Sequence, residues 1–259
     1  MPPITEIALM KNLLTATTIF ALSATTATAQ FITPAGTFGE KPAAVTFGGS
    51  GIPGPVMSTT LGNGSLLVLG ASQRFDNAAL TNNGAGTYFA APGTDISSTP
   101  QLGWARWNFN FHISGQNAGQ YNYRLFYDFN PAEGNTQDQA SYGVVRLLNP
   151  LFNPQTNPSG VVQGSWNLGM GFLTAGNGLD VVPPSFSFSA LTAGTYSFAL
   201  VAYTQVGDRT NPFGTEVGRV AMNVNVVPEP ASIVLMATGL IGTGLVVRRR
   251  RRTTAAAQG

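Results

Sequence analysis

The chain has 259 residues, and only 9% of them are charged, whereas an ordinary soluble domain has roughly 25%. It contains 31 glycines, 17 prolines, one histidine and no cysteine, which excludes disulfide bonds, thiolate metal sites, a cysteine nucleophile and any site with several histidine ligands. Hydrophobic residues make up 43% of the sequence, which is enough to build a core, so the composition is that of a folded protein.

Residues 1–29 have the features of a secretory signal peptide in the correct order. Lys11 supplies a positive charge, an uncharged and largely apolar stretch covers 13–22, and small residues lead to the sequence Ala27-Thr28-Ala29. An A-x-A sequence at this place is a cleavage signal. We expect cleavage after Ala29, with Gln30 as the first residue of the mature chain.

The central part of the chain, residues 30–226, has the pattern of a β-rich domain. Apolar and polar residues alternate with a period of two, most clearly over 107–113, and Gly-rich turn sequences separate the alternating segments. The other predicted strands cover residues 43–47, 66–69, 87–90, 121–129, 143–148, 161–168, 186–188, 196–202 and 220–226. This pattern predicts an all-β fold, an antiparallel β-sandwich in one domain, in which each strand has one buried face and one face in water.

An Asn-Pro pair recurs every four residues in one segment of this domain. The pairs are Asn149-Pro150, Asn153-Pro154 and Asn157-Pro158. Asn-Pro initiates turns and proline excludes a central strand, so residues 149–160 are predicted to form an ordered surface loop. Both a plain connection between strands and a ligand-binding loop fit this pattern.

The densest group of oxygen ligands lies in a predicted loop after a strand. It consists of Asp128, Asn130, Glu133 and Asp138, which are side chains of the kind that bind Ca²⁺. The spacing is not that of an EF-hand, because Ala132 stands at the fifth position from Asp128, where a ligand is required. A plain polar turn is the simplest interpretation, and a Ca²⁺ site and a catalytic pair of carboxylates stay open. We predict no metal ion and no cofactor.

One histidine and three tryptophans complete the candidates for a site. His112 lies on the polar face of the strand predicted at 107–113, so we expect a solvated surface residue, and no G-x-S-x-G sequence offers a serine nucleophile. Trp107 lies on the apolar face of the same strand and is predicted to be in the core. Trp104 and Trp166 fit either a packed position or a surface on which sugar rings stack. We predict that the protein is not an enzyme.

The C-terminal segment contains three elements in a fixed order. It begins Val227-Pro228-Glu229-Pro230-Ala231-Ser232, continues as an uncharged apolar run over 231–247, and ends in the five arginines Arg248, Arg249, Arg250, Arg251 and Arg252. A helix of the 17 residues 231–247 would extend about 25 Å, at the short end of a membrane span. Each arginine costs roughly 2.5–3.5 kcal/mol to insert into a bilayer, so the five together act as a stop-transfer signal that stays in the cytoplasm. We expect a transmembrane helix at 231–247, residues 30–230 outside the inner membrane, and a cytoplasmic tail at 253–259.

This arrangement resembles the PEP-CTERM family of proteins exported by Gram-negative bacteria. The resemblance rests on Pro228-Glu229-Pro230, on Ser232, on the glycines of the apolar run (Gly239, Gly242 and Gly244) and on the arginine cluster. It implies a sorting signal over 227–252, which an exosortase, an integral-membrane enzyme, recognises at the Pro-Glu-Pro region and removes. It also implies transient anchoring in the inner membrane and a final place in the cell envelope, on the cell surface or in the extracellular matrix. The seven residues after Arg252 depart from the family's usual ending.

The charge of the chain changes meaning once these segments are separated. The whole chain has a formal charge of +2 and a pI near 9.1, which is typical of nucleic-acid-binding proteins. Residues 30–230 alone hold seven basic and ten acidic residues, a net charge of −3, so no nucleic-acid partner is predicted. We expect an exported, non-enzymatic surface or matrix protein with extracellular polysaccharide as a candidate partner. The alternative is a carbohydrate- or Ca²⁺-binding adhesive module in the same location.

Overall fold

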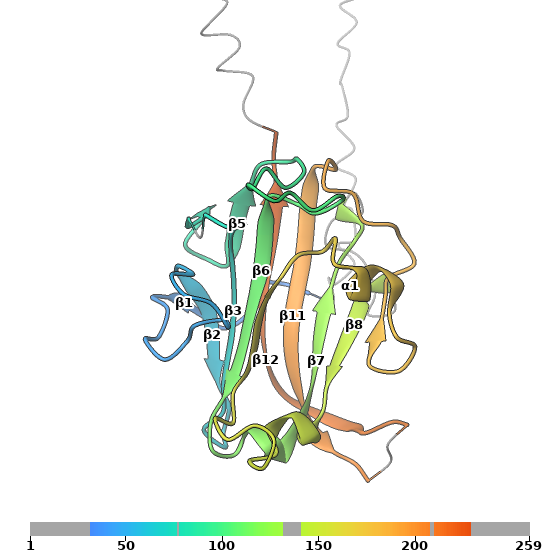
Figure 1. Cartoon of the computed structure of the whole chain (residues 1–259). Helices are drawn as coiled ribbons and strands as arrows, with labels where there is room; N and C mark the ends of the chain where they lie inside the picture. The colour runs from blue at the N-terminus through green and yellow to red at the C-terminus, as the bar shows by residue number, and fades with distance from the viewer. Residues whose placement is uncertain (1–31, 77, 132–140, 208–209, 229–259) are drawn as a thin grey trace, which may run out of the picture.

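The computed structural model describes residues 32–76, 78–131, 141–207 and 210–228, in which two β-sheets pack face to face (Figure 1). The predicted signal peptide and the segment from Glu229 onward lie outside the described residues. The described part of the chain contains one short α-helix, α1 (Gly171–Ala175), and short 3₁₀ turns that include η1 (Ala118–Gln120) and η4 (Asn149–Phe152). Almost all of its remaining regular structure is strand, which confirms the predicted all-β class.

One sheet has five strands in the order β1-β2-β3-β6-β9, and all neighbouring strands are antiparallel. The strands are β1 (Thr37–Gly39), β2 (Val56–Thr60), β3 (Leu66–Gln73), β6 (Trp107–Ser114) and β9 (Val162–Trp166). β6 contains the segment with the clearest alternation in the sequence. Its aromatic side chains face the other sheet, which is the face that the pattern predicts to be buried.

The other sheet has seven strands in the order β10-β8-β7-β11-β12-β5-β4. The strands are β4 (Thr81–Asn82), β5 (Thr87–Ala90), β7 (Tyr121–Tyr127), β8 (Gly143–Leu147), β10 (Val181–Val182), β11 (Gly194–Gln205) and β12 (Phe213–Val226). β5 runs parallel to β12, so the prediction of an entirely antiparallel sandwich is wrong at this pair. The reason is a crossing of the chain, because β4 and β5 follow β3 in sequence but join the opposite sheet before the chain returns as β6.

Aromatic side chains from both sheets meet in the core. The ring of Phe109 on β6 stacks on that of Phe198 on β11, with 4.8 Å between the ring centroids. Trp107 contacts Tyr196 across the same interface at 5.6 Å. All four side chains are fully buried, which confirms the predicted core position of Trp107.

The outer face of the five-stranded sheet is covered by residues 40–55, although the alternation predicts that it faces water. Val45 and Phe47 of this segment are buried in a hydrophobic cluster with residues of β2 and β3. Asn110 and His112, on the polar face of β6, are 0% and 1% exposed. The prediction of a solvated His112 is therefore wrong, because alternation shows that two faces differ in polarity and not what lies over them.

Two predicted strands do not form. Residues 43–47 are a turn within the covering segment, and residues 186–188 make no strand pairs. The second segment follows Pro183-Pro184, where two consecutive residues lack the amide hydrogen that a sheet requires. Phe188 still packs against the core, which explains why its position in the sequence alternates like that of a strand residue.

Candidate functional site

β12, the strand that leads into the predicted sorting segment, is paired on both sides up to its last residue. Val226 is paired with Ala90 of β5 and with Gly194 of β11, and the amide of Val227 donates to the carbonyl oxygen of Ala90 at 3.0 Å. Pro228 is the last described residue, whereas Glu229, Pro230, Ser232 and the five arginines lie outside the described residues. The predicted processing motif therefore begins directly where the sheet ends.

Several loops surround this point and form one end of the sandwich, which we call the exit end. It consists of the end of β12 with Val227, and of residues 74–76, 78–80, 91–106 and 183–193 (top of Figure 1). Hydrogen bonds join the loops, since the amide of Gly93 donates to the carbonyl oxygen of Ala190 at 2.9 Å and the amide of Arg74 donates to the carbonyl oxygen of Arg106 at 2.8 Å. The loops are thus one connected surface rather than separate connections.

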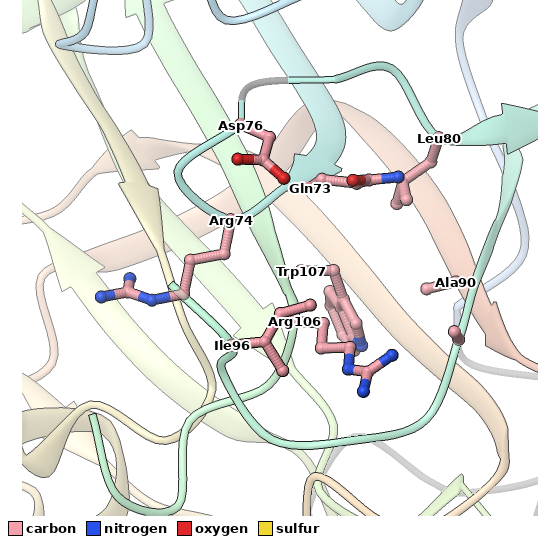
Figure 2. Close-up of a pocket in the computed structure, with 9 residues that line it drawn as sticks. Gln73, Arg74, Asp76, Leu80, Ala90, Ile96, Arg106 and Trp107 are labelled. Carbon is pink, nitrogen blue, oxygen red and sulfur yellow. The ribbon is translucent and has the colours of Figure 1, made fainter. Parts of the chain in front are cut away.

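A pocket of about 200 Å³ lies at the exit end, and its lining side chains are shown in Figure 2. Its walls come from the end of β3, the end of β5 and the start of β6, and they include Arg106, Asp76 and Trp107. Ala90, which accepts the hydrogen bond from Val227, is also a lining residue. The pocket and the start of the predicted sorting segment therefore share a wall.

Arg74 holds the loops of the exit end together. Its Nε lies 2.8 Å from Oδ2 of Asp95, and the two side chains are only 8% and 1% exposed. Its guanidinium carbon lies 4.2 Å from the ring centroid of Phe75 and 4.1 Å from that of Trp104. Trp104, which the sequence left open as a sugar-stacking residue, therefore packs against a cation of the same end.

Asp95 organises the turn that follows it. Its carboxylate accepts hydrogen bonds from the amides of Ser97 at 2.9 Å and of Gln101 at 3.1 Å, as well as from Arg74. Burial alone would raise the pKa of Asp95, but these hydrogen bonds outweigh it and hold the pKa well below its usual range. The carboxylate is thus charged at neutral pH and has a structural role.

Arg106 is the cationic side chain of the pocket that forms no ion pair with a carboxylate of the described residues. Its Nε donates to the carbonyl oxygen of Thr94 at 3.4 Å, and the side chain is half-buried. Asp76, the acidic residue that lines the same pocket, is exposed. This arrangement can bind an anionic group, while nothing in the lining pairs a nucleophile with a base.

A second groove, of about 340 Å³, lies on the outer face of the seven-stranded sheet and is lined by two arginines. Arg124 on β7 and Arg146 on β8 lie directly opposite each other in register. Their guanidinium carbons are 4.1 Å and 5.5 Å from the ring centroid of Phe213, another lining residue. Like charges directly opposite across a strand pair destabilise a sheet. Arg146 also donates from Nη1 to the carbonyl oxygen of Leu179 at 3.2 Å, and an anionic ligand in the groove would interact with both guanidinium groups.

The pairing of these two arginines cannot be predicted from the sequence. The two residues are 22 positions apart, and their register depends on the connection between β7 and β8, which periodicity does not define. The sequence shows only that both arginines occupy polar positions of alternating segments, which does not indicate that they lie opposite each other.

His112 is a buried structural residue in the described part of the chain. Its Nδ1 lies 2.8 Å from Oε1 of Gln163, and Nε2 of Gln163 donates to the hydroxyl of Thr46 at 2.9 Å. Burial lowers the pKa of His112, the contact with Gln163 raises it, and the charge of Lys41 lowers it further, with a net decrease. The imidazole therefore ties β6 and β9 to the covering segment.

The predicted acidic group is only partly described. Asp128 is 1% exposed, and its Oδ1 accepts the amide hydrogen of Asn130 at 2.7 Å, which is the geometry of a polar turn. Glu133 and Asp138 lie outside the described residues. Within the described ranges, no group of three or more His, Asp or Glu residues is placed to hold a metal ion.

The Asn-Pro segment and Trp166 have packing roles. Residues 149–160 form the turn η4 and further turns, and Nδ2 of Asn157 donates to the carbonyl oxygens of Leu151 and Val161, both at 2.9 Å. The predicted ordered surface loop is therefore confirmed. Trp166 is half-buried and contacts Phe111 at 4.5 Å, so its ring packs on the core.

Comparison with known proteins finds a match at the C-terminal end of the chain. The family model for the PEP-CTERM protein-sorting motif matches residues 226–252. No curated protein and no solved structure matches the chain. The motif implies export, sorting to the cell envelope or surface, and an exosortase as the processing partner.

The match begins at Val226, the last residue of β12. In the described ranges no helix is long and apolar enough to cross a bilayer, and the span predicted at 231–247 lies outside those ranges. The chain thus carries a PEP-CTERM protein-sorting motif at residues 226–252, which starts where the last strand of its two-sheet domain ends.

Proposed function

We propose that this chain is an exported, non-enzymatic protein of the cell surface or extracellular matrix. In this proposal residues 1–29 direct export, and the apolar run 231–247 with the arginines that follow anchors the chain transiently in the inner membrane. An exosortase-type enzyme then cleaves at Pro228-Glu229-Pro230. The single observation that carries the proposal is the sorting motif at 226–252.

The position of the motif supports cleavage at this place. Val227 is 41% exposed, and the two prolines that flank Glu229 disfavour helix and strand, which makes this sequence suitable for a protease that binds its substrate in an extended form. The paired end of β12 protects the residues before Val227, because their backbone groups are already hydrogen-bonded. Processing would therefore release the folded domain without damage to the sheet.

The test is replacement of Pro228-Glu229-Pro230 by three alanines in the full chain. We expect the variant to stay in the inner-membrane fraction with its arginine tail, while the unmodified chain reaches the surface without it. Pro154→Ala, at an exposed proline of a distant loop, is the matched control and should be processed normally. Normal processing of the triple-alanine variant would contradict the proposal.

A second candidate function, binding of acidic polysaccharide, is favoured by the groove with Arg124 and Arg146. Paired guanidinium groups beside an aromatic ring suit carboxylate-bearing sugar rings better than neutral ones. We expect the domain to bind a uronate-containing polysaccharide, and Arg124→Gln to weaken this binding. Arg219→Gln is the control, because Arg219 is already paired with Glu216 on β12. Equal binding of neutral and acidic polysaccharides would exclude this role for the groove.

A further inference from the structure

We propose that the exit end is a membrane-contacting surface that seats the domain on a phospholipid bilayer while the sorting segment is still attached. This inference rests on the proposed function, because it requires the segment after Pro230 to be in the membrane. The surface consists of the loop side chains around the end of β12, and its occupant is the boundary between lipid head groups and acyl chains.

The first observation is the concentration of exposed apolar side chains at this end. Leu102 is fully exposed, and Ile96 and Leu191 are 71% and 69% exposed. Phe75, on a third loop of the exit end, is 55% exposed. At the opposite end of the sandwich, Leu151 is 44% exposed. Other exposed apolar side chains are spread over the molecule: Leu179 and Val182 lie at the edge strand β10, and Val206 and Val217, 42% and 38% exposed, lie after β11 and on β12.

The second observation is that these side chains stand on braced loops. Ile96 directly follows Asp95, whose carboxylate binds the amides of Ser97 and Gln101 and is held by Arg74. Leu102 directly follows Gln101, so the two exposed side chains flank one hydrogen-bonded turn. A turn with this bracing presents apolar groups outward at little further cost in conformational entropy.

The third observation is the short connection to the apolar run. Only Pro228, Glu229 and Pro230 separate Val227 from Ala231, where the run begins. At about 3.3–3.6 Å per residue, even a fully extended connection of this length spans only about 10–14 Å. The head-group layer on one side of a bilayer is about 5–7 Å thick. The loops of the exit end therefore have to lie at or near the lipid surface.

The charges at this end also fit a lipid surface. Residues 91–105 contain one ionisable side chain, that of Asp95, which is already paired with Arg74, and residues 183–193 contain none. The third loop differs, because the exposed carboxylate of Asp76 follows Phe75 directly. The apolar tips of the first two loops, Ile96, Leu102 and Leu191, thus carry no charge that contact with lipid would dehydrate. Arg106 is half-buried in the wall of the pocket at this end, and an arginine in such a place can offer its guanidinium to lipid phosphate while its stem stays among apolar groups.

The experiment uses the absence of cysteine in the chain, which makes single-cysteine labelling unambiguous. The full chain is reconstituted in vesicles of phosphatidylethanolamine and phosphatidylglycerol, with a polarity-sensitive fluorophore on Leu102→Cys. Leu151→Cys, at the opposite end, is the matched control. We expect the label at 102 to emit at shorter wavelength and to be quenched by spin-labelled lipid, and the label at 151 to report water.

The outcomes separate this inference from the proposed function, because insertion of the chain is measured independently by its resistance to alkaline extraction. If the chain resists extraction but the label at 102 reports water, the membrane-contacting surface is refuted and the proposed function stands. If the chain is extracted, both fail. A blue shift at 102 without quenching by spin-labelled lipid would indicate contact with protein instead of lipid, and would also overturn the inference.

Discussion

The two ends of the sandwich hold their loops by different interactions and expose different side chains. The exit end is braced by the buried pair of Arg74 and Asp95, and it exposes Leu102 completely. The opposite end includes the loop 149–160, which is held by neutral hydrogen bonds from asparagine side chains to the backbone. Both ends have few charges, so the apolar exposure of the exit end is not a simple result of the low charge of the chain.

The largest expected effect comes from removal of the buried ion pair of Arg74 and Asp95, which we call the brace of the exit end. Arg74→Ala leaves the buried carboxylate of Asp95 without its cation, and we expect the free energy of unfolding to fall by about 3 kcal/mol. Chemical denaturation measures this loss. Arg219→Ala breaks the more exposed pair with Glu216 and should cost less than about 1 kcal/mol. Similar losses for the two variants would mean that the brace is no stronger than a surface ion pair.

The same brace predicts a dependence on pH. Because the folded-state pKa of Asp95 lies below its unfolded value, the pair stabilises the fold above about pH 4 and loses this effect as the pH falls further. Asp95→Asn should therefore flatten the loss of stability in acid, as measured by thermal unfolding between pH 5 and pH 2. An unchanged acid limb would show that other carboxylates dominate it.

Burial of His112 beneath the covering segment 40–55 predicts a second pH dependence of the free energy of unfolding, at higher pH. Burial holds the pKa of His112 below its unfolded value of about 6.5, so the unfolded chain takes up a proton first as the pH falls. We expect stability to decrease below pH 6.5 by at most about 1.4 kcal/mol per pH unit. His112→Gln should remove this slope between pH 6.5 and pH 5, and a slope that persists would place its origin elsewhere.

A smaller effect is expected from the opposite end. Asn157→Ala removes two hydrogen bonds to the backbone, and we expect a loss of about 1 kcal/mol in the free energy of unfolding. Gln155→Ala, at an exposed position of the same loop, should change stability by less than about 0.5 kcal/mol. If both variants are neutral, the asparagine contacts do not hold this loop.

The smallest effects on stability are expected at the exposed leucines of the two ends. Leu102→Ser and Leu151→Ser replace exposed side chains at opposite ends, and each should change the free energy of unfolding by less than about 0.5 kcal/mol. Denaturation of both variants checks this. A large loss for Leu102→Ser would show that its side chain supports folding, and would weaken the case that it is free to contact a membrane.

The fold class and the main strands could be predicted because their signal is local. Alternation over 107–113, 121–129, 196–202 and 220–226 corresponds to β6, β7, β11 and β12. Alternation carries no information about what covers the polar face. The pattern therefore predicts a solvated His112, whereas the residue is buried. It also cannot show that β5 joins β12 in parallel, since this pairing depends on the path of the chain between sheets.

The same distinction between local and tertiary information applies to the candidate sites. The sorting motif could be predicted from consecutive residues, because its elements are defined by their order in the chain. The arginine pair of the outer groove and the brace of the exit end could not, because each joins residues about 20 positions apart through tertiary structure. Trp104 is a further example, since the sequence does not indicate that its ring packs on the guanidinium of Arg74.

The proposed function requires that the C-terminal sorting segment is removed from the mature protein. The most direct test is the intact mass of the surface-exposed protein from cells with and without the processing enzyme. We expect a chain that begins at Gln30 and ends near Pro228–Pro230 when the enzyme is present, and a chain that retains Arg248–Arg252 when it is absent. A surface protein that keeps its five arginines in the presence of the enzyme would show that the segment is not removed.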